Sequence, residues 1–232
     1  MTQHADLAAG PLTVNPLRNN TVTFVDPPFM AFDLAILMRK RDQQSSKVNS
    51  ISSLGGQDKV KYGVIRDGST LNFFETATVQ VYRTMGRKMK GQEDTSLLPS
   101  VADAVRRVRA STDSHPFAFI GEQYQLEYHA SRKPCDVTVV RGADKVLHGS
   151  YHIAVKQSLD ADTINKLKTS LQKLKDAGHL DALYKKWWAD RAECGEVYSS
   201  ASVTGGGGGG TAFLVPVLLT ALLGRLFGDQ QQ

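Results

Sequence analysis

The chain of 232 residues has only two cysteines, Cys135 and Cys194, and neither lies in the Cys-x-x-Cys spacing that holds zinc. It also lacks the His-Glu-x-x-His and Gly-x-Ser-x-Gly motifs, and no nucleophile can be placed beside a base. His148 and His152 are four apart but flank Gly149 next to an expected strand, which argues against a metal site. We therefore expect no enzymatic activity, no metal and no cofactor.

The two cysteines leave two states open. They could be buried free thiols or, in an oxidising compartment, one disulfide bond. Such a bond would close a loop of about 60 residues and would stabilise the fold by roughly 4 kcal/mol in the chain-entropy model.

The sequence has no continuous basic block, although its net charge is +5. Lysines and arginines are scattered among acids, and the run from Arg39 to Arg41 is short, so nucleic acid is not an expected partner. The N-terminus has no charged start followed by an apolar core, so no signal peptide is visible.

Long apolar runs are also rare, and the exception follows a change in composition. Residues 196–210 are rich in Ser and Gly and are predicted to form a flexible linker. Residues 211–227 are apolar and would reach about 25 Å as a helix, which is marginal for a bilayer. They fit a possible membrane span, the removable tail of a lipid-anchor signal, or a tail without function.

The most informative stretch present is a strand, a tight turn and a helix start. The β-branched run 60–65 predicts a strand, and Asp67-Gly68 breaks it. We expect Gly68 to adopt a backbone angle that other residues avoid, and Ser69 or Thr70 to cap the helix that follows. The free amides of such a helix start attract a carboxylate or phosphate, although an ordinary capped helix explains the same residues.

Strands alternate with helices along most of the chain, which favours an α/β fold over a sandwich or a bundle. Residues 29–38 are apolar enough for a buried strand or helix, and residues 39–58 are polar and resemble a linker. We expect helices over 79–89, from Ser100 onward, over 160–178 with Gly178 as C-cap, and over 180–192. Further strands are expected over 117–120, 137–140 and 151–155.

Several motifs, in one order and spacing over residues 11–195, resemble the ligand-binding segments of ionotropic glutamate receptors. Those similar to the end of the first segment are Pro11-Leu12-Thr13, Arg18 and Pro28-Phe29-Met30. Those similar to the second segment are Lys61-Tyr62-Gly63, Asp67-Gly68-Ser69-Thr70, Phe73-Phe74, Arg132-Lys133-Pro134-Cys135-Asp136, Lys186-Trp187-Trp188 and Glu193-Cys194-Gly195.

The resemblance implies a periplasmic-binding-protein-like, two-lobed clamshell with an amino acid held between the lobes. It divides the chain into the end of the first ligand-binding segment (1–38), a linker in place of pore segments (39–58), the second segment (59–195), and the linker (196–210) and apolar tail (211–227) described above. Because ten residues precede the Pro-Leu-Thr motif, the first lobe is expected to be incomplete. Without pore segments, this chain is not expected to conduct ions itself.

The resemblance also implies a set of ligand-binding residues, which are Pro11, Thr13, Arg18, Gly68, Ser69, Thr70 and Glu122. In the family pattern, Arg18 grips the ligand α-carboxylate with two charge-assisted hydrogen bonds, a geometry that lysine cannot copy. The Pro11 carbonyl and Thr13 meet the α-ammonium and α-carboxylate, and Glu122 pairs with the ammonium.

The amides at Ser69 and Thr70 receive the side-chain carboxylate, so the set complements a dicarboxylic amino acid, and glutamate is favoured over glycine. The pattern pairs Cys135 with Cys194 in a disulfide. Two departures, Gln123 after the acid and Ser150-Tyr151-His152 for the usual Gly-Tyr-Gly, alter the expected pocket.

The resemblance thus implies the ligand-binding region of a ligand-gated ion channel subunit that binds L-glutamate or a related amino acid, in a truncated chain. Its family setting is the plasma membrane, with the ligand-binding part extracellular and with other receptor subunits as partners in a tetramer. The alternative is a soluble amino-acid-binding protein of the same fold.

Overall fold

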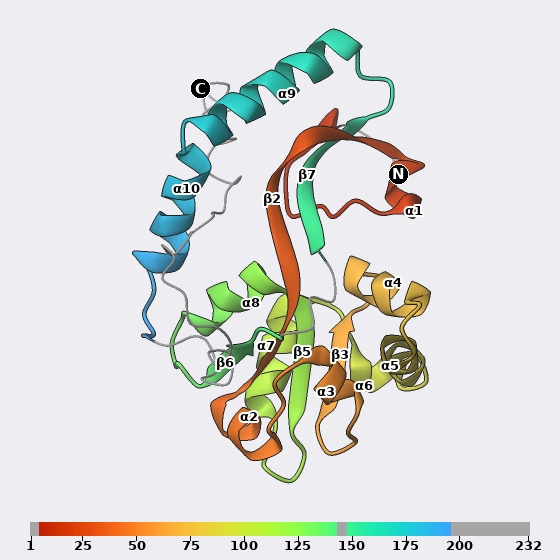
Figure 1. Cartoon of the computed structure of the whole chain (residues 1–232), viewed down its shortest axis with the longest axis vertical. Helices are drawn as coiled ribbons and strands as arrows, with labels where there is room; N and C mark the ends of the chain where they lie inside the picture. The colour runs from red at the N-terminus through yellow and green to blue at the C-terminus, as the bar shows by residue number, and fades with distance from the viewer. Residues whose placement is uncertain (1–4, 143–147, 196–232) are drawn as a thin grey trace, which may run out of the picture. The chain divides into compact units, whose positions relative to one another are not determined.

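In a computed structural model, the chain is described over residues 5–142 and 148–195 and divides into two compact units (Figure 1). Unit 1 contains the described residues 5–32 and 149–191, and unit 2 contains 33–142, 148 and 192–195. The predicted Ser/Gly linker and apolar tail lie outside the described residues. Within the described ranges, no helix combines the length and the apolar character needed to cross a bilayer.

Unit 2 is built on a mixed sheet. Its strands are the second part of β2 (Val22–Arg39), β3 (Lys61–Ile65), β4 (Leu97–Leu98), β5 (Phe117–Glu122) and β6 (Val137–Val140). Strand β2 lies between antiparallel β5 and β6, since Ile36 is in register with both Ile120 and Val140. Strand β3 runs parallel to both β5 and β4.

Helices cover both faces of this sheet. They are α2 (Lys40–Ser46), α3 (Ile51–Gly55), α4 (Ser69–Thr76), α5 (Gln80–Lys90), α6 (Glu93–Ser96), α7 (Val101–Ala110) and α8 (Gln123–Ala130). Alternate β2 residues serve different layers: Ile36 packs with α3, α4 and α5, and Leu37 packs with α7 and α8. A strand buried on both faces reads as a continuous apolar run, which is why its sequence left strand and helix open.

The polar stretch 39–58, predicted to be a linker, contains α2 and α3 and contributes to the core. Ser50 caps α3 by accepting a hydrogen bond from the Ser53 amide at 2.9 Å. Val48, Ile51 and Leu54 are buried in the apolar layer that contains Ile36. A few apolar residues at the right spacing are therefore enough to dock a segment whose composition is mostly polar.

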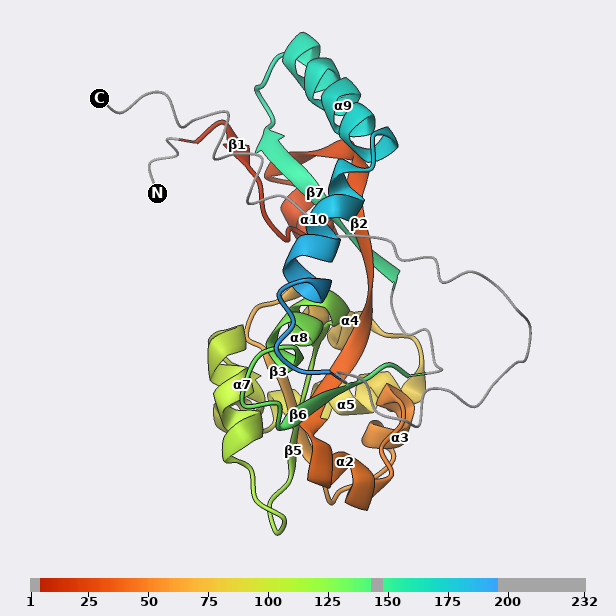
Figure 2. The same ribbon diagram turned by 90° about the vertical axis from the view of Figure 1, so that its left-hand side faces the viewer.

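Unit 1 contains β1 (Leu7–Ala8), α1 (Pro16–Asn19), the first part of β2, β7 (His148–Lys156), α9 (Ala161–Asp176), α10 (His179–Tyr184) and a π-helical turn, η1 (Lys185–Ala189). Strand β7 pairs with β1 in antiparallel register and neighbours β2. The Tyr151 ring on β7 stacks on Phe32 of β2, with centroids 4.6 Å apart. Figure 2 shows α9 continuing through a short connection into α10 and η1.

The predicted long helix forms as α9, with local signals at both ends. Asp160 accepts a hydrogen bond from the Thr163 amide at 2.8 Å and caps the start. Gly178, expected as the C-cap, comes one residue after the C-cap and has φ of +67°. That is the left-handed position at which glycine ends helices.

A disulfide bond joins Cys135 and Cys194, 59 residues apart in unit 2. Of the two states that composition left open, the bridge is therefore the one present, as the resemblance implied. The Glu193 amide next to it donates to the Ser131 carbonyl at 2.8 Å, and the Glu193 carboxylate accepts from the Lys133 amide at 2.9 Å. The bridge and these bonds hold the end of the described chain against unit 2.

Candidate ligand-binding groups

In unit 2, the candidate residues lie where two neighbouring strands end. Strands β3 and β5 are parallel, so their carboxyl ends meet at one edge of the sheet. Helix α4 starts just after β3, and Glu122 is the last residue of β5. Open α/β sheets bind ligands outside the carboxyl ends of their strands. The topology thus brings together residues more than fifty positions apart.

The turn before α4 differs in detail from the sequence prediction. Asp67, not Gly68, takes the left-handed conformation, with φ of +56°, while Gly68 is extended at φ −83°. The expected special backbone angle at Gly68 was therefore wrong. Glycine still suits this position sterically, because a Cβ there would come within 3.2 Å of the Ile65 carbonyl oxygen.

The start of α4 carries no side-chain cap, which corrects the expected capping by Ser69 or Thr70. Gly68 is the N-cap, and the first helical bond runs from the Asn72 amide to its carbonyl at 3.2 Å. The Ser69, Thr70 and Leu71 amides therefore have no hydrogen-bond partner within residues 5–142 and 148–195. Three free amides at the positive end of a helix dipole can bind a carboxylate.

Glu122 lies beside this helix start in a buried position, with 9% of the residue exposed. One carboxylate oxygen accepts from the Ser69 hydroxyl at 3.2 Å, and the other accepts from the Gln125 amide at 2.5 Å. The Ser69 hydroxyl is therefore used to orient the carboxylate. Glu122 also precedes α8 as its N-cap residue, which fixes its backbone at the junction of strand and helix.

In unit 1, Arg18 and Thr13 are held in one local structure. The Asn15 side chain caps α1 by accepting from the Arg18 amide at 2.8 Å, and Pro16 occupies the first helical turn. The Arg18 guanidinium donates to the Thr13 carbonyl at 2.8 Å. Thr13 is buried and forms a β-bridge with Tyr151 of β7, so the segment is tied to the sheet of unit 1.

Most hydrogen-bond donors of Arg18 are not used by the described residues. A guanidinium has five N–H groups. The contact with Thr13 uses one of them, and Arg18 makes no ion pair with any carboxylate in the described part of the chain. The side chain is half-buried, which strengthens an interaction with an anion relative to a fully solvated site. The preceding Pro11 is exposed.

The structure therefore divides the predicted residues into two groups by unit. Group A, in unit 1, consists of Pro11, Thr13 and Arg18, and group B, in unit 2, consists of Gly68, Ser69, Thr70 and Glu122. A printed hydrogen bond joins Arg18 to Thr13 within group A and Ser69 to Glu122 within group B.

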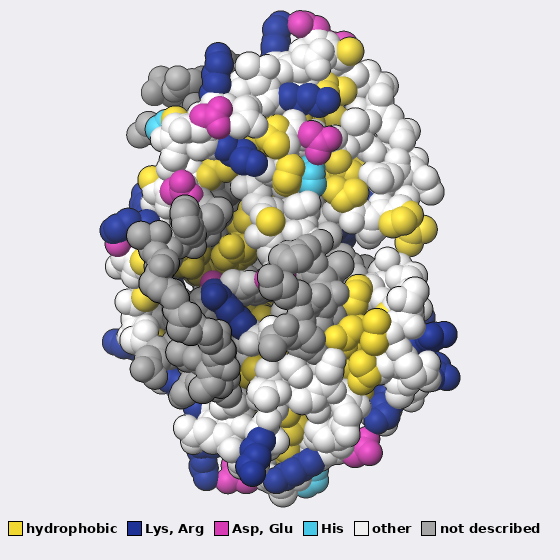
Figure 3. All heavy atoms as spheres, in the orientation of Figure 1, with side chains coloured by type: hydrophobic (Ala, Val, Ile, Leu, Met, Phe, Trp, Pro, Cys, Tyr) yellow, Lys and Arg dark blue, Asp and Glu magenta, His cyan; other side chains and the backbone are white. Residues whose placement is uncertain are grey.

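Two supporting residues, Asn15 and Gln125, were not among the predicted site residues, although Asn15-Pro16 indicates a turn or helix start. Asn15 precedes proline at a helix start, where an Asn cap is common. Gln125 follows the N-cap Glu122 by three positions, the spacing of a reciprocal cap. Both signals are local and were present in the sequence. On the face drawn in Figure 3, lysines and arginines are spread over the surface with acids among them, in agreement with the scattered charges of the sequence.

Comparison with known proteins identifies relatives. Residues 1–190 match the family described as bacterial extracellular solute-binding proteins, family 3. The chain is also 34% identical to glutamate receptor 3 of Homo sapiens over 154 residues, and equally to that of Rattus norvegicus. Each alignment covers 66% of this chain but only 17% of the receptor, so the chain spans a minor part of these relatives.

These matches confirm the resemblance to the ionotropic glutamate receptor family inferred from the motifs. Together with the two α/β units, they also confirm the periplasmic-binding-protein-like fold. The matched family is one of solute-binding proteins and not of enzymes.

Proposed function

The chain belongs to the bacterial extracellular solute-binding proteins, family 3, and from this premise we propose that it binds a small amino acid, with L-glutamate favoured. The observation that carries the proposal is the chemistry of groups A and B. Group A offers an arginine with unused donors, and group B offers a buried carboxylate beside three unpartnered amides. One cation, one anion and one amide nest complement an acidic amino acid.

We assign the roles from the family pattern, and the contacts described above are compatible with them. Arg18 binds the α-carboxylate, and Thr13 and the Pro11 carbonyl complete the contacts in unit 1. Glu122 accepts from the α-ammonium and is kept in place by Ser69 and Gln125. The amides of Ser69 and Thr70, with Gly68 as the preceding turn residue, bind the side-chain carboxylate.

Two settings fit this binding activity. The similarity to glutamate receptor 3 favours the ligand-binding region of a glutamate-gated channel subunit, with other subunits as partners and with the binding region outside the cell. The match to solute-binding proteins favours a soluble binding protein of the same fold. The disulfide agrees with an oxidising, extracellular environment for either. Membrane fractionation of the expressed chain separates them, since membrane retention supports the first and full solubility the second.

Titration calorimetry of the purified chain with L-glutamate tests the proposal. We expect saturable heat for the chain and, for Arg18→Lys, an affinity at least about tenfold lower, because lysine cannot make the bidentate contact. The matched control is Arg83→Lys. Arg83 also donates to a backbone carbonyl five residues earlier, Thr78, at 2.9 Å, but it is not in either group. Absence of heat at millimolar ligand, or equal losses in both variants, would overturn the proposal.

A second comparison tests the role of Glu122. Glutarate has both carboxylates of glutamate but no ammonium, so the chain should bind L-glutamate more tightly than glutarate. Glu122→Gln should remove most of that preference while leaving glutarate affinity nearly unchanged, and Glu75→Gln on the end of α4 should preserve it. A preference that survives in Glu122→Gln would assign the ammonium to another group.

A further inference from the structure

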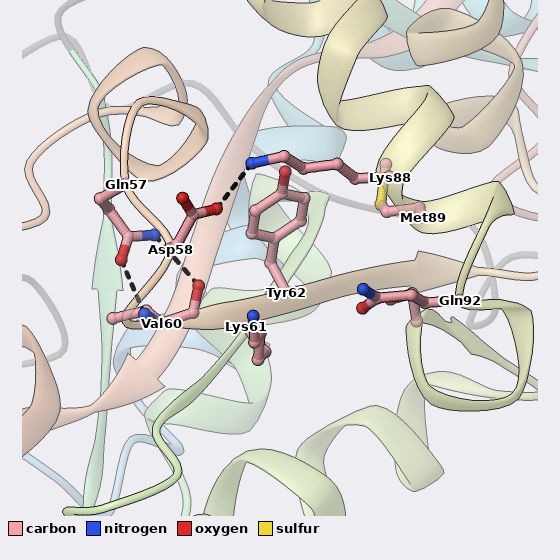
Figure 4. A pocket seen from close by; sticks show the side chains of 9 residues that line it. Gln57, Asp58, Val60, Lys61, Tyr62, Lys88, Met89 and Gln92 are labelled. Carbon is pink, nitrogen blue, oxygen red and sulfur yellow. Dashed lines mark hydrogen bonds and ion pairs between the residues drawn. The ribbon is translucent and has the colours of Figure 1, made fainter.

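Unit 2 also contains a small pocket at the start of β3. Its volume is about 110 Å³, enough for several water molecules or one small molecule. The wall is formed by the residues before β3, by β3 itself, by α5 and by the connection to α6. Figure 4 shows Tyr62 among the residues that line the pocket. Tyr62 lies near the beginning of β3, whereas Ser69 follows its end, so the pocket is separate from group B.

The Tyr62 hydroxyl is the unusual feature of this pocket. The residue is 7% exposed, and its hydroxyl is buried without a hydrogen-bond partner within the described residues. Such groups are rare in folded proteins and call for a partner. Burial, with a smaller contribution from the Asp58 charge, raises the pKa of Tyr62 to about 12. The hydroxyl is therefore protonated at neutral pH and can donate a hydrogen bond.

Positively charged residues outnumber negatively charged ones in the lining of the pocket. Lys61 and Lys88 line the pocket together with one carboxylate, Asp58. Lys88 is bound to Asp58 at 2.7 Å, and the Asp58 side chain is 83% exposed. Because exposed ion pairs contribute little, Lys88 can exchange this partner for a ligand at small cost.

The two glutamine side chains that line the pocket, Gln57 and Gln92, have different roles. The Gln57 amide donates to the carbonyls of Leu54 and Val60 and accepts from the Val60 amide, so it shapes the wall and is not available to a ligand. Figure 4 shows the Gln92 side-chain amide turned toward Tyr62. With two lysines and one carboxylate in its lining, the cavity has an excess of positive charge.

We propose that this pocket is a second binding site, for a small oxyanion such as phosphate, with Tyr62 as the donor and Lys61 and Lys88 as the cations. A metal cation suits it poorly. Two lysines line it beside a single carboxylate, and within the described ranges no three residues of the His, Cys, Asp and Glu types gather as metal ligands. The proposal does not depend on amino-acid binding, since it uses none of the residues of groups A and B.

Titration of the isotope-labelled full chain with inorganic phosphate, followed by NMR, tests the site. Ionic strength is held constant with sodium chloride, so that only specific binding changes the spectrum. We expect saturable shifts at the amides of Tyr62, Lys88 and Gln92. Tyr62→Phe and Lys88→Gln should each weaken the affinity by about tenfold, because each removes one charge-assisted hydrogen bond.

Two control variants on helix α5 match these changes in residue type. Lys90→Gln also removes a lysine of α5, but Lys90 is paired with Glu75 and does not line the pocket. Tyr82→Phe removes a phenol hydroxyl that bonds to Ser52. Both controls should bind phosphate as the parent does, and Tyr62→Phe should melt no lower than the parent. An unchanged spectrum would mean that the cavity holds only water, and equal binding by Tyr62→Phe would mean an adventitious ion only; either result overturns the proposal.

Discussion

Helix α5 of unit 2 and helix α9 of unit 1 share an amphipathic pattern but differ in burial. The apolar face of α5 is buried at Tyr82, Met85 and Met89. Along the longer α9, Leu171 is the buried residue, while Leu167 and the other apolar residues of the stripe are only half-buried. The pattern thus identifies which face of a helix packs, whereas the neighbouring elements determine how deeply it packs. We expect unit 2 to respond more strongly than unit 1 to the loss of interior contacts.

Reduction of the disulfide should have the largest effect. Opening the loop between Cys135 and Cys194 should lower the stability of unit 2 by about 4 kcal/mol in the chain-entropy model. Denaturant unfolding with and without reductant measures it. Trp187 and Trp188, the two tryptophans of the chain, both lie in unit 1, so their fluorescence follows that unit while circular dichroism follows both. Equal shifts of the two signals would contradict separate responses of the units.

Truncation of one apolar side chain in each helix compares their burial directly. Met85→Ala should cost about 3 kcal/mol, because it leaves a cavity in a fully buried layer. Leu167→Ala should cost about 1 kcal/mol, because that side chain is already partly in water. Chemical denaturation of both variants gives the two values. Equal losses would mean that α9 is as deeply packed as α5.

Adding a methyl group at a closely packed glycine compares how tightly the two units are packed. A Cβ on Gly86 of α5 would lie 2.8 Å from the Phe74 carbonyl oxygen, and a Cβ on Gly149 of β7 would lie 2.3 Å from the Phe32 ring. Gly86→Ala should cost about 2 kcal/mol because backbone must move, and Gly149→Ala about 1 kcal/mol because a side chain can turn. Melting temperatures rank the variants, with Gly195→Ala as the control that meets no atom within 4 Å. The reverse order would place the more rigid packing in unit 1.

The smallest effect should come from His129 of α8. Burial lowers its pKa below the usual value, and the Arg109 and Arg132 charges add to this. The unfolded chain therefore binds this proton at higher pH than the folded chain. Stability is retained above the ordinary histidine pKa and falls as the pH drops from there toward the lowered value. His129→Gln should flatten the acid side of a curve of unfolding free energy against pH, and an unchanged curve would contradict this contribution.

Much of the fold was predictable because its signals are local. Ser100 and Asp160 cap helices α7 and α9 as their sequence positions indicate, and β5 follows from an apolar run. The polar stretch 39–58 was harder, because its helices depend on docking Ile51 and Leu54 into a core formed by distant strands. Composition alone does not contain that information.

The sequence names candidate binding residues, but it does not specify their geometry. The contact between Ser69 and Glu122 follows from the parallel pairing of β3 with β5, which no local pattern specifies. The left-handed residue of the turn is Asp67 where glycine was expected. Asp tolerates this conformation through its short polar side chain. The sequence Asp-Gly therefore does not specify which of the two residues is left-handed.

Amino-acid binding through groups A and B is the central claim, and one NMR titration with L-glutamate tests it most directly. The account predicts that the Ser69 and Thr70 amides and the Arg18 guanidinium shift with one common dissociation constant. Shifts confined to one group, or different constants for the two, would contradict the account.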